Sequence, residues 1–118
     1  MVKMTDKKVR ESVQKHVISH YKGNGGKTGL VDEIKYLMRQ GYGTPYRVGL
    51  MLAEGGTFLV YSADILKFLR RIGFKDSTLE NYRGKYKGDI DTMYFRLCAT
   101  ACEEIYKESV KKNKSRGY

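Results

Sequence analysis

Apolar residues recur at helical spacing along most of the chain, and glycine clusters separate the segments that carry this pattern. The first segment covers about residues 6–21 and ends at the glycine-rich stretch 23–26, in which a helix would not persist. The second runs from about Thr28 to Gly41, and a glycine there can terminate a helix. The predicted inner faces consist of Val9, Val13, Val17 and His20 in the first segment and of Leu30, Val31, Ile34, Leu37 and Met38 in the second.

The middle of the chain predicts a short helix followed by an ambiguous apolar run. Thr44-Pro45 is typical of an N-cap with proline at the first helical position, and Gly55-Gly56 terminate the helix. Its buried stripe is predicted to consist of Val48, Met51 and Leu52. The run Phe58-Leu59-Val60-Tyr61 is either a single short strand or a buried connector, because its length and periodicity do not separate the two.

Three further helices are predicted in the second half. Ser62 caps the first of them, which ends at Gly73, and Ser77-Thr78-Leu79-Glu80 matches a capping box for a short helix toward Tyr82. A basic, glycine-containing loop is expected over residues 82–88, before the longest helix at about 89–112. The apolar faces consist of Ile65, Leu66, Phe68, Leu69 and Ile72 in the first helix and of Ile90, Met93, Tyr94, Leu97, Ala101 and Ile105 in the last.

These segments predict a mostly α fold, a compact bundle of five or six helices with at most one short strand or hairpin. A chain of 118 residues supplies one modest hydrophobic core, so residues 1–118 are expected to form a single domain. Residues 111–118 are expected to form a basic, frayed tail.

The charge of the chain suggests what the bundle binds. Lys and Arg number 23 against 13 Asp and Glu, which gives a formal net charge of +10. Such a charge does not specify a fold, but it attracts polyanions: nucleic acid, a nucleoprotein, an acidic protein surface or an anionic membrane. A membrane is disfavoured because no apolar run approaches the roughly 20 residues that span a bilayer. Two cysteines without an export signal indicate a reducing compartment, so we expect a cytoplasmic protein.

Basic residues gather between positions 67 and 88, where the only acids are Asp76 and Glu80. Cations contact phosphates and release counterions, while tyrosines stack on bases or fill a partner's pocket. The predicted partner- or nucleic-acid-binding residues are Lys67, Arg70, Arg71, Lys75, Tyr82, Arg83, Lys85, Tyr86 and Lys87. The alternative is a solvated basic surface without a partner. A second basic group that could extend the surface consists of Lys3, Lys7, Lys8, Arg10 and Lys15.

Two pairs of metal-ligating residues have helical spacing. His16 and His20 lie four apart near one end of the chain, and Cys98 and Cys102 lie four apart near the other, so two helical faces could present four zinc ligands. Packing is the preferred interpretation, because residues 99–101 are small and a free cysteine behaves as a small hydrophobe. A cysteine within an apolar helix also disfavours the thiolate that a nucleophile needs. We therefore expect no cofactor and no enzymatic activity.

Gly26-Lys27-Thr28 matches only the end of a phosphate-binding P-loop. Tyr21 stands where the first glycine of that motif belongs, and a helix rather than a strand leads into the loop. Nucleotide hydrolysis is therefore disfavoured, although backbone amides near Thr28 could hold an isolated phosphate.

Residues 43–47, 55–61 and 64–69 resemble small uncharacterised proteins carried by phages and mobile elements of Gram-positive bacteria. In that group a helix ends in paired glycines, a Phe…Tyr connector follows, and an Asp-led amphipathic helix comes next. The likeness covers about residues 43–70, with a looser similarity at 93–97, and it carries over no functional residue. It implies a protein that binds host machinery in the bacterial cytosol, such as an anti-CRISPR-like inhibitor of a defence nuclease. The positive charge departs from acidic, DNA-mimicking inhibitors and implies guide RNA, DNA or an acidic protein surface as the target.

Two binding hypotheses result: a protein that docks on a nucleoprotein, and a plain DNA- or RNA-binding regulatory domain. Only the first requires an assembled effector complex. A helix-turn-helix around residues 62–82 would suit the second, but the segment after Ser77 is short and offers Asn81 alone for reading bases.

Overall fold

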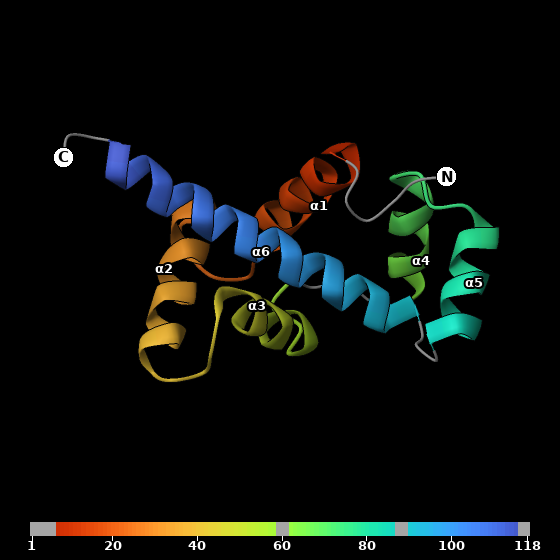
Figure 1. Ribbon diagram of the computed structural model, residues 1–118, viewed down its shortest axis with the longest axis horizontal. Helices are drawn as coiled ribbons and strands as arrows, with labels where there is room; N and C mark the ends of the chain where they lie inside the picture. Colours follow the sequence, from red (N-terminus) through yellow and green to blue (C-terminus); the bar gives the residue numbers. More distant parts are fainter. Residues whose placement is uncertain (1–6, 59–61, 87–89, 116–118) are drawn as a thin grey trace.

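One long helix organises the fold, and every other helix packs against it (Figure 1). The computed structural model describes residues 7–58, 62–86 and 90–115, without the side chains of 62–64, 82–86 and 112–115. The described residues form helices α1 (Lys7–His20), α2 (Gly26–Arg39), α3 (Pro45–Glu54), α4 (Ser62–Arg71), α5 (Asp76–Tyr86) and α6 (Ile90–Ser115). At about 1.5 Å per residue, α6 is about 39 Å long, and the molecule measures 47 × 26 × 23 Å.

The other helices form two groups along α6. Figure 1 shows α1, α2 and α3 around its middle and C-terminal part, and α4 and α5 beside its N-terminal end. The prediction of a compact, mostly α bundle is confirmed, and the described residues contain no strand. The ambiguous connector is described only at Phe58, which is buried, because residues 59–61 lie outside the described residues. No helix in the described ranges is both long and apolar enough to cross a membrane.

The predicted inner face of α6 is confirmed in full. All six of its residues are buried, and Cys98, Ala99 and Cys102 are buried with them. These three small side chains let α3 approach closely: a Cβ added at Gly49 would lie 2.7 Å from Cys102 Cβ and 3.0 Å from Ala99 Cα. We call Gly49, Ala99 and Cys102 the α3–α6 seam.

Helix α3 begins as predicted but is rotated from the predicted orientation. Thr44 Oγ1 accepts a hydrogen bond from the Arg47 amide at 3.2 Å, with Pro45 in the first turn. The prediction that Met51 is buried is wrong, because its side chain is 38% exposed. Gly49 and Ala53 are buried beside Val48 and Leu52, since the glycine turns this edge of the helix toward α6.

Helix α1 also buries a different set from the one predicted. Val9, Val13 and Val17 are in the core, but His20 is exposed, and His16 takes the buried position with 6% of its surface exposed. The buried stripe of α1 therefore runs from position 9 to position 13 and from there to positions 16 and 17, which follow 13 at the helical spacing of 3 and 4 residues.

The predicted basic loop over residues 82–88 is wrong for residues 82–86, which continue α5 as a helix. A single glycine inside a helix costs only about 1 kcal/mol, so Gly84 does not end it. The helix also begins at Asp76 instead of with a capping box at Ser77. At the other end of the chain, α6 continues to Ser115, three residues beyond the predicted end of the last helix at about residue 112.

Candidate functional site

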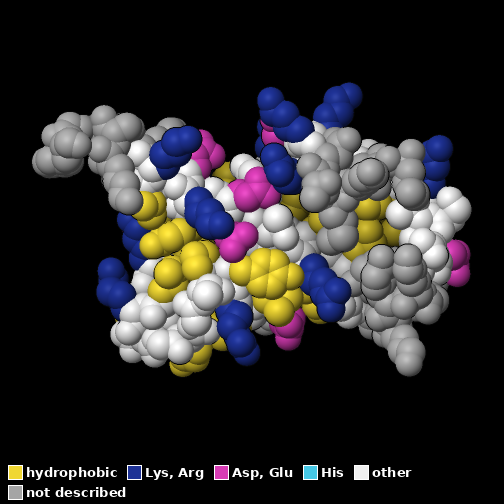
Figure 2. All heavy atoms as spheres, viewed as in Figure 1, with side chains coloured by type: hydrophobic (Ala, Val, Ile, Leu, Met, Phe, Trp, Pro, Cys, Tyr) yellow, Lys and Arg dark blue, Asp and Glu magenta, His cyan; other side chains and the backbone are white. Residues whose placement is uncertain are grey.

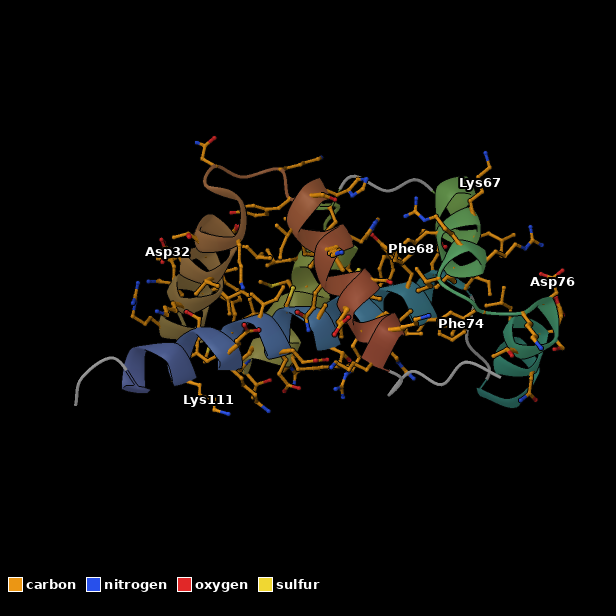
Figure 3. The ribbon with its side chains drawn as sticks, turned by 90° about the horizontal axis from the view of Figure 1, so that it is seen from above. Asp32, Lys67, Phe68, Phe74, Asp76 and Lys111 are labelled. Atoms are coloured by element: carbon orange, nitrogen blue, oxygen red, sulfur yellow. The ribbon has the colours of Figure 1, made fainter. Side chains whose placement is uncertain are left out.

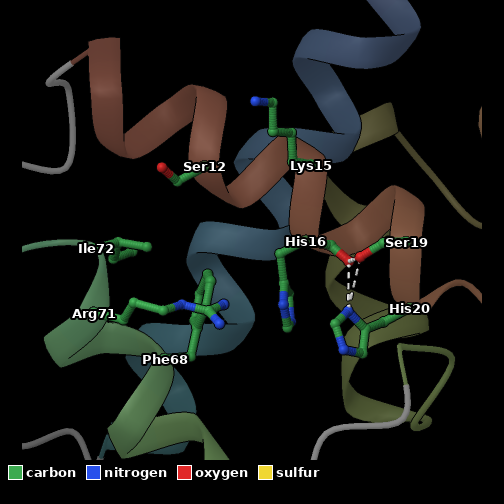
Figure 4. Close-up of a pocket in the computed structure, with 8 residues that line it drawn as sticks. All are labelled: Ser12, Lys15, His16, Ser19, His20, Phe68, Arg71 and Ile72. Carbon is green, nitrogen blue, oxygen red and sulfur yellow. Dashed lines mark hydrogen bonds between the residues drawn. The ribbon is translucent and has the colours of Figure 1, made fainter.

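A pocket of about 350 Å³ lies between α1 and α4 (Figure 4). Eight residues line it: Ser12, Lys15, His16, Ser19 and His20 from α1, Phe68 and Arg71 from α4, and Ile72 after α4. None of these residues is acidic. They come from two segments that lie about 50 positions apart in the sequence. We call this the α1–α4 pocket.

His16 forms the buried side of the pocket. Its ring stacks on Phe68 with the ring centroids 4.1 Å apart, and its Nε2 lies 2.8 Å from the hydroxyl of Tyr94 on α6. Its Nδ1 is buried and has no partner among the described residues. Either neutral tautomer leaves this nitrogen unpaired, as a donor or as an acceptor, and an unpaired buried polar atom is unfavourable.

The surroundings of His16 keep its ring neutral. Burial is the largest cause, and the neighbouring His20 and Arg71 add to it, so that the pKa of His16 falls from 6.5 to about 4. At neutral pH, His16 is therefore a polar, uncharged group inside a positively charged pocket.

His20 has a defined tautomer. Its Nδ1 lies 3.0 Å from the backbone carbonyl oxygen of His16 and 3.0 Å from Ser19 Oγ (Figure 4). Because a carbonyl oxygen only accepts, Nδ1 carries the hydrogen, and Nε2 of the neutral ring is an acceptor.

The lysine and the arginine that line the pocket, Lys15 and Arg71, are not neutralised by a carboxylate of the described residues. Neither Lys15 nor Arg71 forms an ion pair with any described residue, and Arg71 lies over the Phe68 ring, 5.5 Å from its centroid. Nearby cations behave differently: Arg10 pairs with Glu104 at 3.5 Å and Arg70 with Asp76 at 2.9 Å. The positive charge of this pocket therefore remains available to an anionic partner.

The predicted binding residues are divided by the structure. Lys67, Arg70, Arg71 and Lys75 are all exposed, but only Arg71 lines the pocket. Figure 3 shows Phe68 directed from α4 toward α1 and Lys67 directed away. Tyr82, Arg83, Lys85 and Tyr86 lie on α5 with side chains outside the described residues, and Lys87 lies wholly outside them.

The second basic group contributes through one member. Lys15 lines the pocket, Lys7 pairs with Glu11 on its own helix, and Lys3 lies outside the described residues. Figure 2 shows Lys and Arg spread along the whole visible face, with Asp and Glu among them. Positive charge alone therefore does not select a site, and the cavity between α1 and α4 is the feature that distinguishes Lys15 and Arg71 from the other cations.

The alternative zinc set is not assembled. No three His, Cys, Asp or Glu side chains in the described part of the chain come together as metal ligands. Cys98 and Cys102 are free thiols in the core, and burial raises both pKa values, that of Cys102 to about 12. Such thiols stay protonated and pack as small apolar groups.

The P-loop-like segment is the start of a helix. Gly25 precedes α2 with φ 92°, in the left-handed region, and Lys27 pairs with Glu108 of α6 at 4.0 Å. Lys27 is thus directed toward the surface of α6.

Sequence reasoning did not identify His16 as the buried side of a pocket. The available signal was its place three residues after Val13, where the spacing of the apolar stripe requires a buried side chain. Phe68 was expected only as a core residue. Comparisons with protein-family models, curated proteins and solved structures gave no match for this chain.

Proposed function

We propose that this protein is a non-enzymatic binding protein that attaches to nucleic acid, free or within a nucleoprotein, through the cationic face of α1 and α4. The observation that carries the proposal is the α1–α4 pocket, which Lys15 and Arg71 line without an acidic residue. A hollow lined by charge of one sign concentrates the electrostatic field and attracts polyanions. Phosphate contacts by such cations supply most of the affinity of non-specific nucleic-acid binding.

The titratable groups near the pocket support binding rather than catalysis. His16 is held neutral with a pKa of about 4, which is too low for an effective general base at neutral pH. Burial is the largest cause that raises the pKa of Tyr94 and that of Cys98 above their ordinary values. None of the three is activated as a nucleophile or proton carrier.

Docking on a nucleoprotein, as in anti-CRISPR-like inhibition of a bacterial defence nuclease, is the form of this proposal that the resemblance over residues 43–70 favours. A plain DNA- or RNA-binding regulatory domain is the alternative. Helices α4 and α5, joined by residues 72–75, are the elements on which a helix-turn-helix mode of binding would depend.

Fluorescence anisotropy with labelled single-stranded and duplex oligonucleotides tests the proposal. Because two phosphate contacts would be lost, we expect Lys15→Gln with Arg71→Gln to weaken binding by at least about tenfold and to flatten its salt dependence. The matched control is Arg39→Gln with Arg47→Gln, which removes the same charge from exposed positions on α2 and α3 and should leave affinity within about threefold, because long-range attraction alone is screened by salt.

Equal losses in the two double variants would reduce the interface to non-specific charge and contradict a site on α1 and α4. A pull-down from bacterial lysate, with and without nuclease, then separates the two forms. Capture of a nuclease complex that persists after digestion of free nucleic acid supports the inhibitor, and capture of nucleic acid alone supports the regulatory domain.

A further inference from the structure

We propose that the α1–α4 pocket is a discrete binding site for one phosphate group, held by Arg71 beside His16, with the imidazole of His20 at its edge and Lys15 on its α1 side. The proposal rests on the proposed function only for the source of the phosphate, which is either a nucleic-acid strand or a small phosphomonoester. Three features of the pocket lead to this assignment: its uncompensated charge, its unpaired buried nitrogen and its volume.

The charge of the pocket comes from two helices. Lys15 stands on α1 and Arg71 on α4, and Figure 4 shows the Arg71 side chain directed toward Phe68 and His16 and the Lys15 side chain directed away from them. Neither cation has a carboxylate partner among the described residues, in contrast to Arg10 and Arg70. A guanidinium group forms strong, bidentate charged hydrogen bonds with phosphate oxygens, so Arg71 is the group that would hold the anion.

His16 is a second observation, independent of net charge. It is nine-tenths buried and lines the pocket, and its Nδ1 lacks a partner in the described structure. Nearly all buried polar atoms in folded proteins have a hydrogen-bond partner, so an orphan in a pocket wall marks a place where ligand oxygen would be stabilising. A phosphate supplies both acceptor oxygens and, when monoprotonated, a hydroxyl donor, and therefore satisfies either tautomer of His16.

The volume of about 350 Å³ is larger than a phosphate alone requires and falls within the range of small-molecule sites. Phe68 and Ile72 provide apolar surface beside the cations. The pocket therefore accommodates a phosphate together with the sugar that bears it, which favours a phosphomonoester or a strand terminus over the inorganic ion.

Two-dimensional NMR titration of the full chain tests the site, with inorganic phosphate, a nucleoside 5′-monophosphate and sulfate as probes. We expect saturable shifts confined to amides of α1 and α4. Affinity should fall at least about tenfold in Arg71→Gln, because a hydrogen bond to a charged group is lost. Arg39→Gln is the charge-matched control and should bind as the unmodified protein does.

Failure of the phosphate site can be distinguished from failure of the proposed function. Non-saturable shifts, or equal affinity in Arg71→Gln and Arg39→Gln, overturn the phosphate site, while oligonucleotide binding measured separately can still support the proposed function. Saturable nucleotide binding in the pocket without oligonucleotide binding supports the site and assigns it to a small phosphomonoester. Preference for a 5′-phosphorylated over a 5′-hydroxyl oligonucleotide assigns it to a strand terminus.

Discussion

The α3–α6 seam and the α1–α4 pocket lie in different parts of the molecule and differ in how closely their helices pack. At the seam, Gly49 brings α3 so close to Ala99 and Cys102 that one added methyl group would have no room. At the pocket, the bulky Tyr94 of α6 reaches His16, and a cavity of about 350 Å³ remains between α1 and α4. Close packing stabilises a fold but leaves no space for a ligand. The comparison places the tightest helix packing at the seam and the space for a ligand at the pocket.

The largest expected effect is a pH dependence of the free energy of unfolding that arises from His16 at the α1–α4 pocket. The pKa of His16 is about 4 in the folded protein, compared with an ordinary value of 6.5, so below pH 6.5 the unfolded chain binds a proton that the native chain excludes. The free energy of unfolding should therefore decrease as pH falls from about 6.5 to 4, by up to about 3 kcal/mol, and this contribution should level off below that range. Urea unfolding at a series of pH values measures the change.

His16→Phe is the matched variant, because it retains an aromatic ring against Phe68 and removes the titrating group. The difference in stability between this variant and the unmodified protein should vary with pH over the same range. A difference that is constant from pH 7 to pH 4 would show that the pocket imposes no cost on the charged ring.

Gly49→Ala examines the seam and should have the next largest effect. Overpacking of this kind costs about 1–3 kcal/mol, while the better helix propensity of alanine returns up to about 1 kcal/mol. We expect a net loss of stability in thermal unfolding, because the nearest atoms include the backbone of Ala99, which cannot move as a flexible side chain would. Met51→Ala on the exposed side of α3 serves as the control and should be nearly neutral. A stabilised Gly49→Ala protein would mean that α3 can move away from α6.

Thr44→Ala gives the smallest of the three effects. It removes the hydrogen bond from the Arg47 amide to Thr44 Oγ1 and should lower the free energy of unfolding by about 1 kcal/mol. Thr44→Ser retains the acceptor oxygen and should recover most of that loss in the same unfolding measurement. If Thr44→Ala proves more damaging than Gly49→Ala, the position of α3 depends on its first turn more than on the seam.

The sequence predicted the fold better than the site, for physical reasons. The inner face of α6 was correct at all six positions, because a helix of 26 residues repeats its apolar spacing many times. Helix α3 has only 10 residues, and its rotation is decided by contact between Gly49 and α6, which no local pattern encodes. The extent of α5 was missed because Gly84 was read as part of a loop, although the helix continues through it.

The pocket itself depends on residues that sequence spacing does not relate. Arg71 was predicted as a binding residue and Lys15 only as an extension of the basic surface, and nothing local indicates that α1 and α4 face each other. For His16 and His20 the spacing allows either zinc ligation or packing and places His20 on the inner face, whereas the structure buries His16 and exposes His20. Separating these roles required the tertiary position of Phe68 and Tyr94.

Helix α6 has a consequence for how the chain is made. It contacts all five helices that precede it, so those helices are synthesised before the surface against which they pack. Folding of the complete core therefore awaits translation beyond Ile90.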